Sequence, residues 1–305
     1  MNTERHEARA EKPPPGAGRR SPRMFRFAVM LAICVLGLIV LGALVTSEIQ
    51  PVPGSAKPVV SPSTQTDVLL LRAHTGAALA VGVLTLCLAI WLQSAGTRAW
   101  LRRLAWTAVA VILAETWAGA RNTLESLPRA AGFLHALLAQ LLLSIVVAIA
   151  VGAAGLPERD QPVGDSGRPP LRSLAAAMLS LALLQIVLGA AYRHGLMGVL
   201  LHILNALMVA IVVLVTCVLV IRQFPSHSSL RPAALALGIV TGVQVILGFA
   251  TYILVVIDSG TATALLILSV GHVATGALAL AGTVLLAIQI WRNVRPGKRL
   301  SRLIL

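Results

Sequence analysis

Long apolar segments, separated by short stretches that carry charge, proline or glycine, constrain the fold of this chain more than any other feature. A helix needs about 20 apolar residues to cross the hydrocarbon core of a bilayer. Only 12% of the residues are charged, against about 25% in a soluble protein. We therefore predict an all-α integral membrane protein with eight transmembrane helices rather than a soluble enzyme. The predicted helices lie at 26–46, 68–94, 104–120, 130–154, 172–191, 196–222, 231–255 and 261–291.

Most of the 25 lysines and arginines fall on one side of these predicted helices. They occupy an amino-terminal arm (residues 1–25), the connections after the second, fourth and sixth segments, and a basic tail (residues 292–305). The positive-inside rule then places both termini in the cytoplasm. Because the net charge of +14 is divided among these connections and does not form one patch, nucleic-acid binding is not expected. The opposite side carries Lys57, Arg72, Arg121, Arg129 and Arg193.

The arm and the cysteines narrow the possibilities further. The arm contains Pro13-Pro14-Pro15-Gly16 and is expected to be disordered. We expect the first helix to stay uncleaved, because no small-residue cleavage site follows it. Cys34, Cys87 and Cys217 all fall within predicted helices, and the chain has no CxxC motif. Neither a disulfide nor a covalently attached c-type haem is indicated.

A repeat runs through the eight segments. Three of the odd-numbered segments carry a polar residue four positions before a glycine near their end, namely Glu115, Gln185 and Gln244. Small residues let helices approach closely, and polar residues form hydrogen bonds across the contact. We therefore predict two pseudo-symmetric four-helix bundles, 26–154 and 172–291. The repeated glycine sequences are Leu41-Gly42-Ala43, Ala118-Gly119-Ala120, Leu188-Gly189-Ala190 and Leu247-Gly248-Phe249. Each even-numbered segment carries one histidine, and these are His74, His135, His202 and His272.

The four histidines occupy equivalent places in the repeat, roughly 8–15 Å from the outer ends of their helices. An ionisable residue inside a span costs free energy and indicates a functional site, although a neutral imidazole bonded to a neighbouring helix is an alternative for each. Neutral imidazoles without thiolates or a carboxylate cluster suit axial ligation of haem, whereas zinc more often recruits Cys, Asp or Glu. We predict two bis-histidine haem sites, one in each half, lying side by side near the outer face.

The sequences around these histidines resemble those of the haem A synthase family, over most of residues 26–291. The most specific pieces are Gln185–His194, His202, Gln244–Gly248 and Gly271–Gly276. The resemblance implies an oxidoreductase in the inner (plasma) membrane of a bacterium that converts haem O to haem A by successive hydroxylation of the C8 methyl. It also implies that a haem O supplier and the cytochrome oxidase assembly machinery are partners, with a homo-oligomer possible.

The resemblance assigns different haems to the two histidine pairs. His202 and His272 would ligate the iron of a resident haem b, and His74 and His135 would surround the iron of the substrate haem. Family members usually have a Glu three residues before the first histidine and an Arg directly after it, whereas this chain has Leu71 and Thr75. The family's cysteine pair in the first outer loop is also absent from residues 47–67.

The catalytic residues are therefore left unassigned. Asp67 and Glu115 are candidates for the missing acid, but Glu115 aligns in the repeat with Gln185 and Gln244, which favours a structural hydrogen bond. Arginines near the outer helix ends are candidate partners of haem propionates, with snorkelling to lipid headgroups as the alternative. These arginines are Arg72, Arg121, Arg129 and Arg193. His194 and His227 are expected at the surface, and His6 lies in the arm.

Two other classes of protein stay open. A non-catalytic b-type electron carrier or assembly factor of the same fold is favoured by Leu71 and Thr75. A transporter is compatible with the duplication and with the acid Glu115 inside a span. Against a transporter, both halves start from the same side, and no pair of interrupted helices is evident at the midplane.

Overall fold

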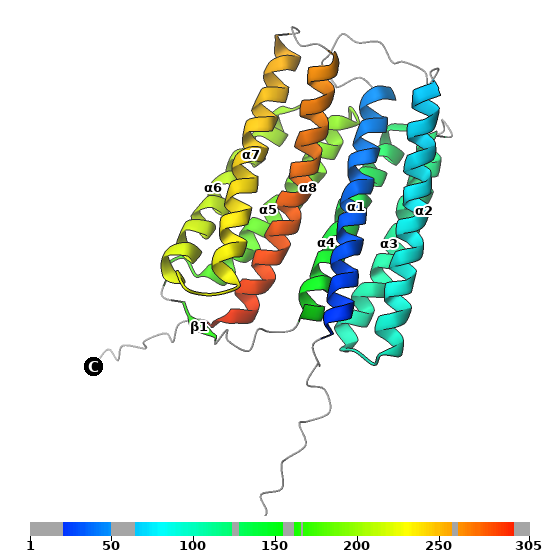
Figure 1. Ribbon diagram of the computed structural model, residues 1–305. Coiled ribbons are helices and arrows are strands. Elements are labelled where there is room, and N and C mark those ends of the chain that lie inside the picture. Colours follow the sequence, from blue (N-terminus) through cyan, green and yellow to red (C-terminus); the bar gives the residue numbers. More distant parts are fainter. Residues whose placement is uncertain are drawn as a thin grey trace, which may run out of the picture.

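The computed structural model describes residues 21–49, 65–123, 128–154, 162–165, 167–257 and 262–295. These residues form eight long helices and one short sheet of two strands (Figure 1). The helices are α1 (Pro22–Ile49), α2 (Gln65–Ser94), α3 (Ala99–Thr123), α4 (Pro128–Ala154), α5 (Leu171–Arg193), α6 (Leu200–Gln223), α7 (Leu230–Val256) and α8 (Ala262–Asn293). The strands are β1 (Val163–Gly164) and β2 (Val294–Arg295).

Seven of the described helices are long and apolar enough to cross a membrane, and the chain is a multi-pass α-helical membrane protein. The exception is α3, which has 25 residues but includes Arg102, Arg103, Glu115 and Arg121. At about 1.5 Å per residue its length alone would suffice to span a bilayer. The helix α3 therefore differs from the other seven in composition and not in length, because charged residues interrupt its apolar sequence. The predicted segment 104–120 is nevertheless helical.

The first helix begins earlier than the sequence pattern predicts. We expected the arm to extend to residue 25, but α1 starts at Pro22. Proline is well suited to the first turn of a helix, and the hydroxyl of Ser21 accepts a hydrogen bond from the backbone N–H of Met24 at 3.4 Å. The side chain of Met24 is buried, so packing also stabilises this extra turn. Residues 1–20 of the predicted arm and 296–305 of the predicted tail lie outside the described residues.

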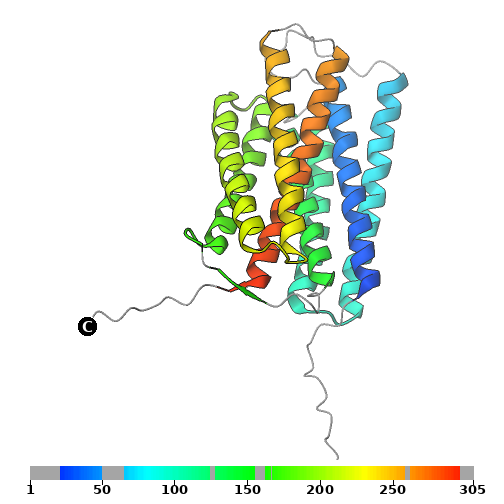
Figure 2. The ribbon, with the colours of Figure 1, turned by 60° about the vertical axis from the view of Figure 1, so that its left-hand side comes forward.

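The first four helices contact one another in chain order, and so do the last four; these sets are called here the first and the last group (Figures 1 and 2). Among the first four, α1 and α3 each contact both α2 and α4, and among the last four, α5 and α7 each contact both α6 and α8. The groups meet where α8 contacts α1 and α4, and where α4 contacts α5. Buried apolar side chains form one cluster within each group, and Ala277 of α8 belongs to the cluster of the first group.

Most described arginines lie at the end of the molecule where α1 starts and α8 finishes, called here the basic end (Figure 1). At this end β1 pairs with β2 in parallel, with Val163 opposite Val294. The carboxylate of Asp165 accepts hydrogen bonds from the backbone N–H groups of Gly167 (2.8 Å) and Leu171 (2.7 Å), which caps the start of α5. Together these contacts hold the segment before α5 against the finish of α8.

Candidate functional site

The four histidines of the repeat lie in two pairs near the end of the molecule opposite the basic end. His74 of α2 and His135 of α4 have ring centroids 6.0 Å apart, with an angle of 79° between the ring planes. His202 of α6 and His272 of α8 are 6.3 Å apart at 83°. The structure thus brings the same histidines together that the repeat associates, with one pair in each group of helices.

Each imidazole ring lies against the glycine that ends the repeat on the preceding helix. A Cβ atom on Gly42 would lie 3.1 Å from Cε1 of His74, and one on Gly119 would lie 2.9 Å from Cε1 of His135. The corresponding distances are 2.9 Å for Gly189 with His202 and 2.7 Å for Gly248 with His272. Because real Cβ contacts are rarely this short, the glycines leave the space that the rings fill. The imidazole rings of the four histidines therefore pack against the repeated glycines of the preceding helices.

The histidines of the last four helices have amide partners, and the first is Gln185. Its Nε2 lies 3.0 Å from Nδ1 of His202 and donates to the carbonyl oxygen of the same residue at 3.1 Å. The side chain of Asn205 donates to Oε1 of Gln185 at 2.7 Å and to the carbonyl of Leu181 at 3.1 Å. The orientation of both amides follows, because an amide nitrogen must face each carbonyl. The NH₂ group of Gln185 therefore faces the ring of His202.

Gln244 repeats this arrangement on α7. Its Nε2 lies 3.3 Å from Nε2 of His272, and its Oε1 contacts the hydroxyl of Thr275. A Cβ atom on Gly276 would lie only 3.0 Å from Nε2 of Gln244, so the small residue four positions after the histidine leaves room for the amide. Asn205 and Thr275 each follow their histidine by three residues, which places them one turn along the same helix face.

The first four helices have different polar chemistry at the equivalent positions. Oε1 of Glu115 lies 3.1 Å from Nδ1 of His135, and only 2% of the glutamate side chain is exposed. The residue of α1 that corresponds to Glu115 is Leu38, which is apolar and buried. Nδ1 of His74 is buried and has no hydrogen-bond partner within the described part of the chain. This pair therefore holds one carboxylate and one unpartnered ring nitrogen.

The other candidate site residues are placed less uniformly. Arg193 donates to the hydroxyl of Ser47 at 2.8 Å, which links the end of α5 to the end of α1. Arg72 and Arg129 are exposed at the same end of the molecule. Thr75 donates its hydroxyl to the carbonyl of Leu71 on its own helix at 2.9 Å. The side chains of Asp67 and Arg121 lie outside the described residues.

One histidine differs from expectation. We expected His194 at the surface, but it follows the last residue of α5 and only 9% of it is exposed. Burial, the nearby charge of Arg193 and the proximity of His135 lower the pKa of His194 to about 4. His227 is half-buried at the basic end, where its Nδ1 accepts from the backbone N–H groups of Ser229 (3.3 Å) and Leu230 (3.2 Å) at the start of α7.

The second histidine pair also has neighbours that were not among the predicted site residues. The ring of Tyr192 stacks on that of His202, with centroids 6.5 Å apart and an angle of 16°. Asn205 and Thr275 were not predicted either. Both lie three residues after their histidine, and this shared spacing was a signal. The signal is absent from the first half of the repeat, where the equivalent residues after His74 and His135 are Ala77 and Leu138.

The donor set of each site consists of two imidazoles. Within the described residues, no group of three or more His, Cys, Asp or Glu side chains is arranged to hold a metal ion. Cys34, Cys87 and Cys217 are free thiols on different helices. The arrangement therefore offers two separate pairs of imidazole nitrogens, each between four helices.

No protein-family model matches the chain, and no curated protein sequence is significantly similar to it. The fold and the site define a class of protein, namely a multi-pass helical membrane protein with two half-buried histidine pairs.

Proposed function

We propose that this chain is a haem-binding membrane oxidoreductase of the haem A synthase type, which oxidises the C8 methyl of haem O to give haem A. In this proposal His202 and His272 hold haem b, and His74 and His135 hold the substrate haem. The observation that carries the proposal is the spacing of the two imidazole pairs, 6.0 Å and 6.3 Å between ring centroids. The haem supplies the redox-active iron, and the protein supplies the ligands and the position of the substrate.

The spacing fits two imidazoles that share one metal ion. A bond from a metal to an imidazole nitrogen is about 2 Å long, and the ring centroid lies about 1.1 Å behind the nitrogen. Two imidazole rings that shared one iron ion would therefore have centroids at most about 6 Å apart. Both observed separations are close to this value.

The contacts of His202 bear on its tautomer. The NH₂ group of Gln185 lies 3.0 Å from Nδ1 of His202, a contact that is favourable only when Nδ1 carries the lone pair, so the proton of the neutral ring is on Nε2. Ligation of iron through Nε2 of His202 would therefore require this proton to move to Nδ1 and the amide of Gln185 to turn. Ligation through Nε2 of His272 requires the amide of Gln244 to turn, because its nitrogen is 3.3 Å from that atom.

The proposal extends to the organisation of the whole chain. The two groups of helices would be related four-helix bundles, and α3 would be the eighth transmembrane span. The arginines of the basic end would face the cytoplasm of a bacterial cell, with both termini on that side. The histidine pairs would then lie side by side in the outer part of the membrane. Arg193, which already bonds across the two groups, would be available to a haem propionate at their junction.

A second function is favoured by the surroundings of His74. Leu71 supplies no acid, the hydroxyl of Thr75 is bonded within its own helix, and Nδ1 of His74 has no partner in the described part of the chain. These features support a b-type electron carrier or an assembly factor that binds haem without hydroxylating it. Glu115 is the described acid that contacts the first histidine pair. The enzyme would need this acid for proton transfer, whereas a non-catalytic haem protein would not.

The test is to express the full chain in a host that makes haem O, purify it with the electron acceptor present during growth, and identify the extracted haems by mass spectrometry. Haem A or its hydroxylated precursor supports the enzyme, and haem B with haem O alone supports the non-catalytic protein. His202→Ala should remove the haem b spectrum. His227→Ala is the matched control, because His227 lies at the basic end, and it should retain the full spectrum. A colourless protein would overturn both proposals and favour a transporter.

A further inference from the structure

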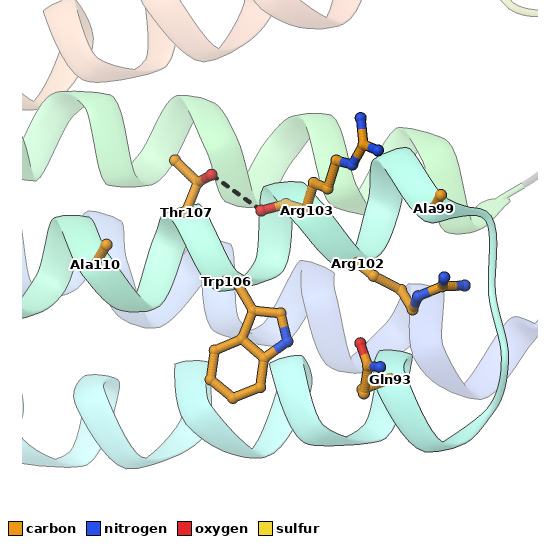
Figure 3. Close-up of a pocket in the computed structure, with 7 residues that line it drawn as sticks. All are labelled: Gln93, Ala99, Arg102, Arg103, Trp106, Thr107 and Ala110. Carbon is orange, nitrogen blue, oxygen red and sulfur yellow. Dashed lines mark hydrogen bonds between the residues drawn. The ribbon is translucent and has the colours of Figure 1, made fainter.

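A cavity of about 550 Å³ lies at the basic end, on the outer side of α3 and next to the end of α2 (Figure 3). Its polar lining consists of Gln93 from α2 and Arg102, Arg103 and Thr107 from α3, with the indole of Trp106 beside them. Figure 3 shows Arg102, Trp106 and Gln93 on the side of α3 that faces α2, and Arg103 and Thr107 on the other side of the helix. The cavity plays no part in the histidine pairs.

The helix periodicity explains why polar groups gather here. Leu101, Ala105 and Ala108 are buried on the face of α3 that packs against the other helices. Arg102 and Trp106 are separated by four residues, as are Arg103 and Thr107, so each couple lies one turn apart on the other faces. Trp106 is 45% exposed. Tryptophan is enriched where a helix leaves the hydrocarbon region of a membrane, which places the cavity at the level of the lipid headgroups.

The two arginines have positive charge available for a ligand. Nη1 of Arg102 donates to the carbonyl oxygen of Thr97 in the turn between α2 and α3, which fixes this guanidinium near Gln93. Within the described residues, the guanidinium of Arg103 has no hydrogen-bond or ion-pair partner. The described carboxylates are engaged elsewhere, since Glu115 contacts His135 and Asp165 caps α5. Guanidinium groups bind phosphate oxygens with two parallel hydrogen bonds.

We propose that this cavity binds the phosphate headgroup of an anionic phospholipid. The apolar surface of α3 continues from the cavity along one stripe, through Trp106, Ala110, Leu113 and Trp117, at helical spacing. Leu113 is 66% exposed and Trp117 is 58% exposed, so the stripe is open to the acyl chains of a lipid. A basic pocket between transmembrane helices is a known form of site for acidic headgroups. The stripe distinguishes a lipid from a soluble phosphate, which has no acyl chain.

The test compares binding of three probes to the purified, delipidated full chain in detergent, with bound lipid counted by native mass spectrometry. Dioleoyl phosphatidylglycerol should bind at least about tenfold more tightly than dioleoyl phosphatidylcholine, because each arginine near a headgroup contributes to attraction of negative charge. Inorganic phosphate should compete only weakly. If phosphate bound as tightly as phosphatidylglycerol, or if the two lipids bound equally, the lipid site would be overturned.

Variants locate the binding. Arg102→Gln with Arg103→Gln should remove the preference for phosphatidylglycerol, and Arg103→Gln alone, which breaks no hydrogen bond of the described fold, should reduce it. The matched control is Arg23→Gln with Arg26→Gln on α1, because both of these arginines are exposed at the basic end and lie outside the cavity. The control should retain the preference. An equal loss in the control would show attraction to the whole basic end and would overturn the proposed site.

Discussion

In both groups of helices each imidazole lies against a glycine of the preceding helix, but the polar groups around the imidazoles differ. In the last four helices each imidazole faces an amide, and each amide is held by Asn205 or Thr275. In the first four helices the imidazole of His135 faces the carboxylate of Glu115, and Nδ1 of His74 has no hydrogen-bond partner in the described part of the chain. The comparison shows that backbone geometry and polar chemistry are specified separately. Glycine sets where a ring can lie, and the residue one turn earlier sets what the ring contacts.

The largest effect should follow from closing the space that a glycine leaves. Gly248→Ala places a methyl group 2.7 Å from the ring of His272, so we expect a loss of about 1–3 kcal/mol in the free energy of unfolding. Gly42→Ala, at 3.1 Å from His74, should cost less. Thermal unfolding in detergent measures both. Gly242→Ala on α7 is the control, because a Cβ there meets nothing within 4 Å. Equal costs at all three positions would show that the rings do not depend on the glycines.

A smaller effect should separate the amide from the carboxylate. Gln185→Leu removes the partner of the His202 ring and also frees the side chain of Asn205, so we expect a loss of about 2 kcal/mol. Glu115→Leu removes one contact but also ends the cost of burying an acid, so it should stay within about 1 kcal/mol of the parent protein. Glu115→Gln, which copies the amide of the other group, controls for the change in volume. A larger loss at Glu115 than at Gln185 would reverse the comparison.

The smallest effect should come from supplying the partner that His74 lacks. Leu38→Gln places an amide at the position of α1 that corresponds to Gln185 and Gln244. Interhelical hydrogen bonds in membrane proteins average about 0.6 kcal/mol, so a gain of about that size in unfolding free energy is expected. Leu38→Asn, whose side chain is one methylene shorter, should give no gain. Destabilisation by both variants would show that Leu38 contributes through packing alone.

Much of this arrangement could be predicted from the sequence. The long apolar segments predict the helices because a bilayer demands about 20 apolar residues. A glycine sequence near the end of each odd-numbered segment, followed by one histidine on the next segment, occurs four times and associates the histidines before any coordinates are known. Alignment of the repeat also shows that Leu38 is the apolar residue at the position where the other odd-numbered segments carry Glu115, Gln185 and Gln244. These features depend on local pattern and on repetition, which sequence displays directly.

Other features depend on contacts between distant segments and left no local signal. His194 follows a helix end, a place where exposure is the usual outcome, yet it is buried because the end of α5 packs near the first group of helices. The pairing of β1 with β2 joins residues about 130 positions apart. The stacking of Tyr192 on His202 joins α5 to α6 across a turn in which Gly195 adopts φ +66°, a conformation that favours glycine. Sequence periodicity assigns a face to a residue but does not identify the neighbour on that face.

The position of α8 has a consequence for biogenesis. This helix carries His272 of the second pair, places Ala277 in the apolar cluster of the first group, and contacts α1, α4, α5 and α7. Arg292 near its end also donates to the carbonyl oxygen of Val151 on α4 at 2.9 Å. A ribosome completes α8 after all the other described helices. Until α8 is inserted, the surfaces of α1, α4, α5 and α7 that it contacts are uncovered. Insertion of this one helix therefore completes the packing of both groups.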